Sequence, residues 1–134
     1  MDQDPGPAPR PLSRVLVVDD NRDTADSTAL LLRMISHEVQ VAYGGREAIA
    51  PARRQAPEFI LLDLGLPGMD GYQVATSLKQ DLSGSDAIII VISGYGTLED
   101  RQRSREAGID HHLLKPVDPR VLLELLSPSP ANDA

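Results

Sequence analysis

The chain has no cysteine, only two lysines and no long apolar segment, and these absences exclude several classes of protein. Without cysteine there is no disulfide, no thiolate nucleophile and no cysteine-type zinc site. The longest apolar stretch, Ala87–Ile92, is far shorter than the roughly 20 residues that span a membrane. The first residues are acidic and proline-rich, unlike a secretory signal. We therefore expect a cytoplasmic protein that does not contact a membrane directly.

The charge balance is acidic, with 13 Lys and Arg against 20 Asp and Glu and a formal net charge of −7. Binding to a nucleic acid depends on an excess of basic residues, so direct nucleic-acid binding is not expected. Eleven of the basic residues are arginines, and the two lysines are Lys79 and Lys115. A length of 134 residues fits one domain with a core of its own.

Prolines gather at the two ends of the chain. Four of the 11 prolines lie within the first 11 residues and two more within the last seven. We expect residues 1–12 to be a disordered proline-rich tail or linker and residues 127–134 a disordered C-terminal tail. The folded domain then covers residues 13–126.

Between the tails, short apolar runs alternate with stretches of helical periodicity. Strands are expected at Val15–Val18, Val39–Ala42, Phe59–Leu62, Ile88–Ile92 and His112–Leu114. Helices are expected at Thr24–Ile35, Arg46–Gln55, Tyr72–Gln80, Leu98–Ala107 and Pro119–Leu126. Strands that are apolar on both faces and alternate with helices favour an α/β fold, a doubly wound parallel sheet with helices on both faces.

Local signals indicate where three of these helices begin or bend. Asp23 is available as the N-cap of the first helix, and Asp118 as that of the last, with Pro119 at its first position. Pro51 lies inside the second helix, where it removes the hydrogen bond to Glu47 and is expected to kink or shorten the helix.

Polar side chains follow four of the expected strands at the point where each strand ends. Asp19 and Asp20 follow the first, Asp63 the third, Ser93 the fourth and Lys115 the fifth. In an open parallel sheet these ends meet at one edge, where ligands bind. Clustered carboxylates repel one another unless a cation neutralises them, and Mg2+ prefers oxygen ligands of this kind. The combination indicates phosphoryl-group handling, with a carboxylate as the nucleophile.

Four motifs in this order resemble the receiver domain of bacterial two-component response regulators. They are Val17–Asp20, Leu61–Gly71, Ile92–Gly94 and Leu114–Pro116. The resemblance extends from about Arg14 to Leu126. It implies a five-stranded flavodoxin-like sheet in the order 2-1-3-4-5, and a signalling switch with at most weak self-dephosphorylation rather than a conventional enzyme.

The resemblance also implies a role for each acidic residue. Asp63 would accept the phosphoryl group from a histidine kinase or a phosphotransfer protein. Asp20, Asp63 and the backbone carbonyl of Gly65 would bind Mg2+, and Asp19 would help to hold the ion through water. Gly65 replaces a residue that is often polar in this family.

Three further residues would respond to the presence of the phosphoryl group. Lys115 would contact it, and Ser93 would move toward it as the switch hydroxyl. His112 occupies the switch position that usually carries an aromatic ring. The resemblance further implies a cis peptide bond between Lys115 and Pro116. The switch would control a downstream protein that the sequence does not name.

Three other functions compete with this interpretation. A phosphohydrolase of the haloacid dehalogenase type also uses an aspartyl nucleophile, but it needs a second aspartate where this chain has Gly65. A nucleotide- or flavin-binding domain would continue the glycines at positions 94 and 96 with a third, where Glu99 stands. A pseudo-receiver that docks a partner without phosphorylation is the third alternative.

The last part of the sequence bears on the parent protein. The stretch His111–Pro119 resembles receivers at the C-terminal end of hybrid sensor kinases, and the chain ends soon after the last expected helix. We expect either a stand-alone receiver or a receiver segment of a larger protein. The neighbouring His111 and His112 are not expected to share a metal ion, because neighbours on a strand point to opposite faces.

Overall fold

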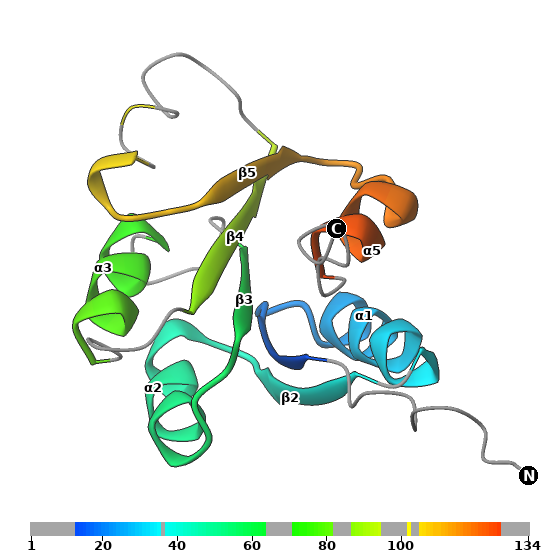
Figure 1. Ribbon diagram of the computed structural model, residues 1–134, viewed down its shortest axis with the longest axis horizontal. Helices are drawn as coiled ribbons and strands as arrows, with labels where there is room; N and C mark the ends of the chain where they lie inside the picture. The colour runs from blue at the N-terminus through cyan, green and yellow to red at the C-terminus, as the bar shows by residue number, and fades with distance from the viewer. Residues whose placement is uncertain are drawn as a thin grey trace, which may run out of the picture.

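The computed structural model describes residues 13–35, 37–63, 71–81, 87–94, 102 and 105–126. Its five strands are β1 (Arg14–Val18), β2 (Glu38–Ala42), β3 (Phe59–Asp63), β4 (Ile88–Ser93) and β5 (His111–Leu114). They form one sheet in the order β2-β1-β3-β4-β5, and every neighbouring pair is parallel (Figure 1). The expected fold class and strand order are confirmed.

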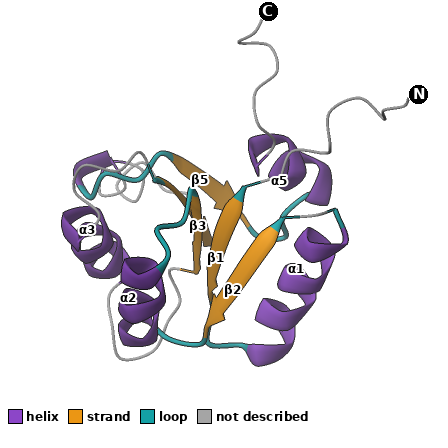
Figure 2. Cartoon of the chain, turned by 60° about the horizontal axis from the view of Figure 1, so that its bottom comes forward, coloured by secondary structure: helices purple, strands orange, loops and turns teal. Residues whose placement is uncertain are grey.

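Helices cover both faces of this sheet. They are α1 (Arg22–Met34), α2 (Gly45–Arg54), α3 (Gly71–Asp81) and α5 (Pro119–Leu126). Helices α2 and α3 lie on one face, and α1 and α5 lie on the other (Figures 1 and 2). The helix expected at Leu98–Ala107 falls largely outside the described residues, as do both expected tails. Within the described part of the chain, no helix is long and apolar enough to cross a membrane.

The sheet separates two apolar cores, because successive side chains of a strand point to opposite faces. On the α2/α3 side, Ile60 and Ile89 are fully buried and pack with the small helix residues Ala48 and Ala52. On the α1/α5 side, the core includes the following residues: Val15, Val17, Leu61, Ile90, Ala25, Leu32, Leu122 and Leu126. Burial of both faces explains why β1, β3 and β4 are apolar without polar alternation, whereas the edge strands β2 and β5 are only partly buried.

The start of α1 differs from the sequence prediction. The helix begins at Arg22, and its N-cap is Asn21, whose side-chain oxygen accepts the backbone N–H of Thr24 at 3.0 Å. Asp23 lies inside the first turn, where its negative charge interacts favourably with the helix dipole, but it is not the N-cap. The prediction was wrong because the first turn is exposed and carries no apolar signal.

The other two local signals had different outcomes. Helix α2 continues for three residues beyond Pro51 and is not cut short by it. At α5, the Asp118 side chain accepts the backbone N–H of Arg120 at 2.9 Å, in agreement with its expected capping role. The Lys115–Pro116 peptide bond is cis, as the family resemblance implies.

Candidate functional site

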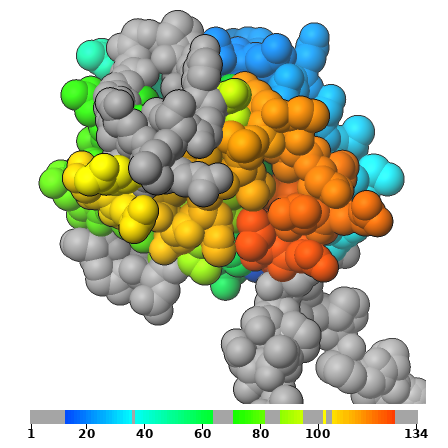
Figure 3. Space-filling model, turned by 90° about the horizontal axis from the view of Figure 1, so that it is seen from above, coloured from blue at the N-terminus to red at the C-terminus, as the bar shows by residue number. Residues whose placement is uncertain are grey.

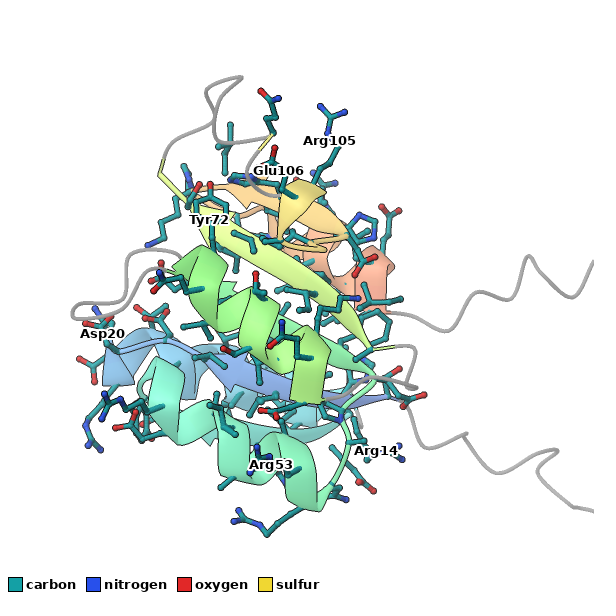
Figure 4. The ribbon with its side chains drawn as sticks, turned by 90° about the vertical axis from the view of Figure 1, so that its left-hand side faces the viewer. Arg14, Asp20, Arg53, Tyr72, Arg105 and Glu106 are labelled. Carbon is teal, nitrogen blue, oxygen red and sulfur yellow. The ribbon has the colours of Figure 1, made fainter. Side chains whose placement is uncertain are left out.

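The candidate site lies at the carboxyl edge of the sheet, where β1, β3, β4 and β5 end. Asp63 and Ser93 are the last residues of β3 and β4, and Asp19 and Lys115 directly follow β1 and β5. Because all four strands run in the same direction, these residues arrive at one edge. Figure 4 shows Asp20 at this edge, at the opposite end of β1 from Arg14.

Three carboxylates form the centre of the site. Asp19, Asp20 and Asp63 each offer an oxygen, and these oxygens lie within 4.8 Å of one another. Asp63 is buried, with 8% of its surface exposed, whereas Asp20 is exposed. Hard carboxylate oxygens at this spacing, some buried and some open to water, suit Mg2+, which keeps part of its water shell and takes one or two carboxylates. The residues therefore fit the ion that the sequence predicts.

The pKa of Asp19 is raised by its surroundings, which include a second negative charge. Burial raises the pKa of its carboxyl, and the neighbouring charge of Asp63 acts in the same direction. The backbone N–H of Asn21, which donates to Asp19 Oδ1 at 3.0 Å, opposes this rise. A cation among the carboxylates would relieve the repulsion that remains.

Lys115 supplies a positive charge beside Asp63. Its Nζ lies 3.4 Å from Oδ1 and 3.2 Å from Oδ2 of that carboxylate. The Lys115 side chain is half exposed, whereas that of Asp63 is only 10% exposed. The Lys115 ammonium can therefore contact a group bound to the Asp63 carboxylate and remain hydrated. The backbone N–H of Lys115 also donates to the Ser93 carbonyl at 2.8 Å, which fixes the two strand ends relative to each other.

Ser93 and His112 meet beside this cluster. Ser93 Oγ lies 2.7 Å from Nε2 of His112, and Ser93 is 4% exposed. His112 is partly buried and its neighbour His111 is exposed, so the two rings point to different sides of β5. This arrangement agrees with the expectation that the two histidines do not share an ion.

A cavity of about 540 Å³ adjoins the carboxylates and Lys115. Its polar lining includes Asp19, Asp63 and Lys115, together with Asn21 and the hydroxyl residues Thr24 and Thr28 of α1. The apolar lining consists of these residues: Val17, Val18, Leu61, Ile92, Pro116, Val117 and Leu122. The carboxylates and the ammonium thus border a space that an incoming group can enter.

Most of the residues singled out in the sequence meet at this edge, but some lie outside the description. Gly65 and most of the motif Leu61–Gly71 beyond Asp63 fall in the undescribed part of the chain. Sequence reasoning missed Asn21, which both caps α1 and hydrogen-bonds Asp19. The signal for it was available, because Asn is among the residues preferred at an N-cap and Asn21 directly precedes the helix.

A family model supports the same interpretation. The model of the response regulator receiver domain matches residues 15–127, which is most of the chain. Among curated proteins, the transcriptional regulatory protein PrrA of Mycobacterium tuberculosis is 39% identical over 114 residues, which cover 85% of this chain and 47% of PrrA. Protein PilH of Pseudomonas aeruginosa is 28% identical, covering 87% of this chain and 96% of PilH. The chain spans about half the length of several curated relatives that it matches.

Solved structures give the same fold. A CheY-like receiver domain from Methanospirillum hungatei has a TM-score of 0.78 and 34% identity, covering 85% of this chain and 90% of that structure. The chemotaxis protein CheY4 of Vibrio cholerae has a TM-score of 0.80 and 27% identity, covering 86% and 96%. The strand order and helix placement described above are therefore those of known receiver structures.

Proposed function

The chain belongs to the response regulator receiver family, and we propose from this premise that Asp63 is its phosphoacceptor and that its phosphorylation requires Mg2+. Receiver domains of this family act as signalling switches, and phosphorylation of an aspartate is inherent to them. The observation that carries the proposal is the surroundings of Asp63. It is a buried carboxylate with two other carboxylates within 4.8 Å and an ammonium at 3.2 Å.

The chemistry follows from these neighbours. A carboxylate oxygen of Asp63 attacks the phosphorus, the bond from phosphorus to the donor atom breaks, and its electron pair leaves with the donor. The product is an aspartyl phosphate. Lys115 neutralises charge on the phosphoryl oxygens, which spreads over them in the transition state. Asp20 and Asp63, with the carbonyl of Gly65, would hold Mg2+, and Asp19 would hold it through water. When bound, the ion shields the phosphoryl charge from the carboxylates.

The proposed partners are proteins of a phosphorelay. A histidine kinase or a phosphotransfer protein would donate the phosphoryl group, and a downstream protein would respond to the altered surface. We propose a cytoplasmic location and no direct contact with nucleic acid or membrane, in keeping with the acidic charge balance. The phosphohydrolase alternative has no carboxylate at position 65 to act as its general acid.

Phosphorylation by a small-molecule donor tests the proposal. Purified protein is incubated with acetyl phosphate and Mg2+, and its intact mass is measured. The wild type is expected to gain one phosphoryl group, Asp63→Asn none, and any sample with excess EDTA none. Asp26→Asn is the matched control, because Asp26 is an exposed aspartate of α1 outside the cluster. Equal incorporation in Asp63→Asn and the wild type would contradict the assignment, and no incorporation in any sample would favour the docking-only alternative.

A further inference from the structure

The hydrogen bond between Ser93 and His112 joins the ends of two neighbouring strands. In the parallel pair of β4 and β5, Val91 pairs with His112 and Ser93 pairs with Leu114. His112 therefore lies one alternate position along the strands from the level of Ser93. Both side chains are on the face opposite the α1/α5 core, because the intervening Leu113 packs into that core. The bond of 2.7 Å is short, and Ser93 is 4% exposed, so water competes poorly for the hydroxyl.

The backbone of Ser93 is held in place by hydrogen bonds to its neighbours. Its carbonyl accepts the Lys115 N–H at 2.8 Å, and the residue is part of β4. A change of hydrogen-bond partner therefore involves the Ser93 side chain rather than a movement of its backbone. The segment from β5 to α5, drawn in gold to red in Figure 3, runs across the molecular surface. His112 itself is partly buried.

A serine hydroxyl has one proton to donate. When the His112 ring carries its proton on Nδ1, Nε2 accepts the Ser93 hydroxyl proton, and Ser93 cannot then donate that proton to an oxygen of a phosphoryl group on Asp63. We propose that His112 carries its ring proton on Nδ1 and is a positioning residue whose Nε2 accepts the Ser93 hydroxyl proton, so that the imidazole and the phosphoryl group compete for the same proton. This inference rests on the proposed function of Asp63 and Ser93. It assigns to His112 a restraint on the phosphorylated state, which differs from the role of a ring that only fills space.

The proposal predicts that deleting the hydrogen-bonding atoms of His112 raises the affinity of the site for a phosphoryl group. Loss of the imidazole removes a competitor, so binding of a phosphoryl group should become tighter rather than weaker. A neutral hydrogen bond of this kind corresponds to about a two- to tenfold change in an equilibrium constant. A purely structural role of His112 would give the opposite result, because a loosened strand end would weaken binding.

Beryllium fluoride with Mg2+, a mimic of the phosphoryl group, provides the probe, and isothermal titration calorimetry provides its affinity. His112→Phe keeps a ring but deletes the hydrogen-bonding atoms, and His112→Leu is a second deletion in case the first does not fold. Both are expected to bind the probe about two- to tenfold more tightly than the wild type. His112→Gln places an amide near the position of Nε2 and should restore the wild-type affinity. His111→Phe, at the exposed neighbouring position, is the matched control and should change nothing.

A double-mutant cycle isolates the serine. In a Ser93→Ala background, His112→Phe should no longer tighten binding, because the contested proton is absent. The affinity for Mg2+ alone should be equal in all variants. Unchanged or weaker binding in both deletion variants, or tightening that persists with Ser93→Ala, would overturn the inference while leaving the proposed function intact. Failure of the wild type to bind the probe would instead overturn the proposed function and this inference with it.

Discussion

Neutralising Asp19 should raise the stability of the protein without Mg2+ and reduce the stability that it gains from Mg2+. Without a cation, the Asp19 carboxylate is partly buried and repelled by Asp63, and both effects raise its pKa. Asp19→Asn removes this charge and keeps the side-chain oxygen that accepts the Asn21 N–H at 3.0 Å. The variant should therefore be more stable than the wild type when no divalent cation is present. In Mg2+ the wild type should gain more stability, because the ion is attracted to all three carboxylates.

The magnitude follows from the spacing of the charges. Two unit charges 4.8 Å apart, the largest separation within the cluster, repel by about 0.9 kcal/mol in water and about 3.5 kcal/mol at an effective dielectric constant of 20. Asp20 is exposed, so its repulsion lies near the lower value, and the attraction of Lys115 offsets part of the rest. We expect a net gain of about 1–2 kcal/mol in the free energy of unfolding at pH 7. The affinity for Mg2+ should fall by about tenfold.

Urea denaturation in EDTA and in excess Mg2+ measures both quantities. Glu38→Gln serves as the control, because it removes one exposed carboxylate from β2, far along the strand from the cluster. This control should change stability by less than about 0.5 kcal/mol in either buffer. If Asp19→Asn is less stable than the wild type in EDTA, or gains as much stability from Mg2+, the interpretation of the carboxylates as a repulsive cation site is wrong.

Three further changes test other parts of the structure. Asn21→Ala removes the N-cap of α1 and should cost about 1 kcal/mol in urea denaturation, whereas Asn21→Ser should cost less; equal values would rule out the capping role. Burial lowers the pKa of His37, whose ordinary value is 6.5, so the unfolded chain takes up the proton first and stability falls as pH drops through 6.5. His37→Gln should lose less stability than the wild type between about pH 7.5 and about pH 5.5, and an equal loss would refute this assignment. Lys115→Arg should keep the fold but slow phosphorylation by acetyl phosphate about tenfold or more, since a planar guanidinium cannot replace the compact ammonium; wild-type rates would contradict this.

The sequence was sufficient for the fold because its strongest signals are repeated. The strands β1, β3 and β4 are apolar runs buried on both faces, and each described helix has a periodic apolar face, so the alternation of the two predicts a layered parallel sheet. The strand bounds are correct to within one residue, as for Phe59–Asp63 against the expected Phe59–Leu62. The polar positions that end the strands could be located for the same reason.

Two kinds of feature could not be predicted in this way. The start of α1 is a local choice between two neighbouring caps, Asn21, which accepts the Thr24 N–H, and Asp23, which the sequence offers equally. The second kind depends on tertiary contacts. The bond between Ser93 and His112 joins residues 19 positions apart and depends on the register of β4 and β5. No local pattern specifies that register. The sequence therefore identified both residues but not their contact.

The most direct test of the central claim locates the phosphoryl group on the chain. After incubation with acetyl phosphate and Mg2+, the acyl phosphate is reduced with borohydride, which converts a phosphorylated aspartate to homoserine, and the modified peptide is identified by tandem mass spectrometry. We predict homoserine at Asp63 and at no other position, with no modification when Mg2+ is removed. Homoserine at Asp19 or Asp20 instead, or at Asp63 to the same extent without Mg2+, would contradict the proposed phosphoacceptor site.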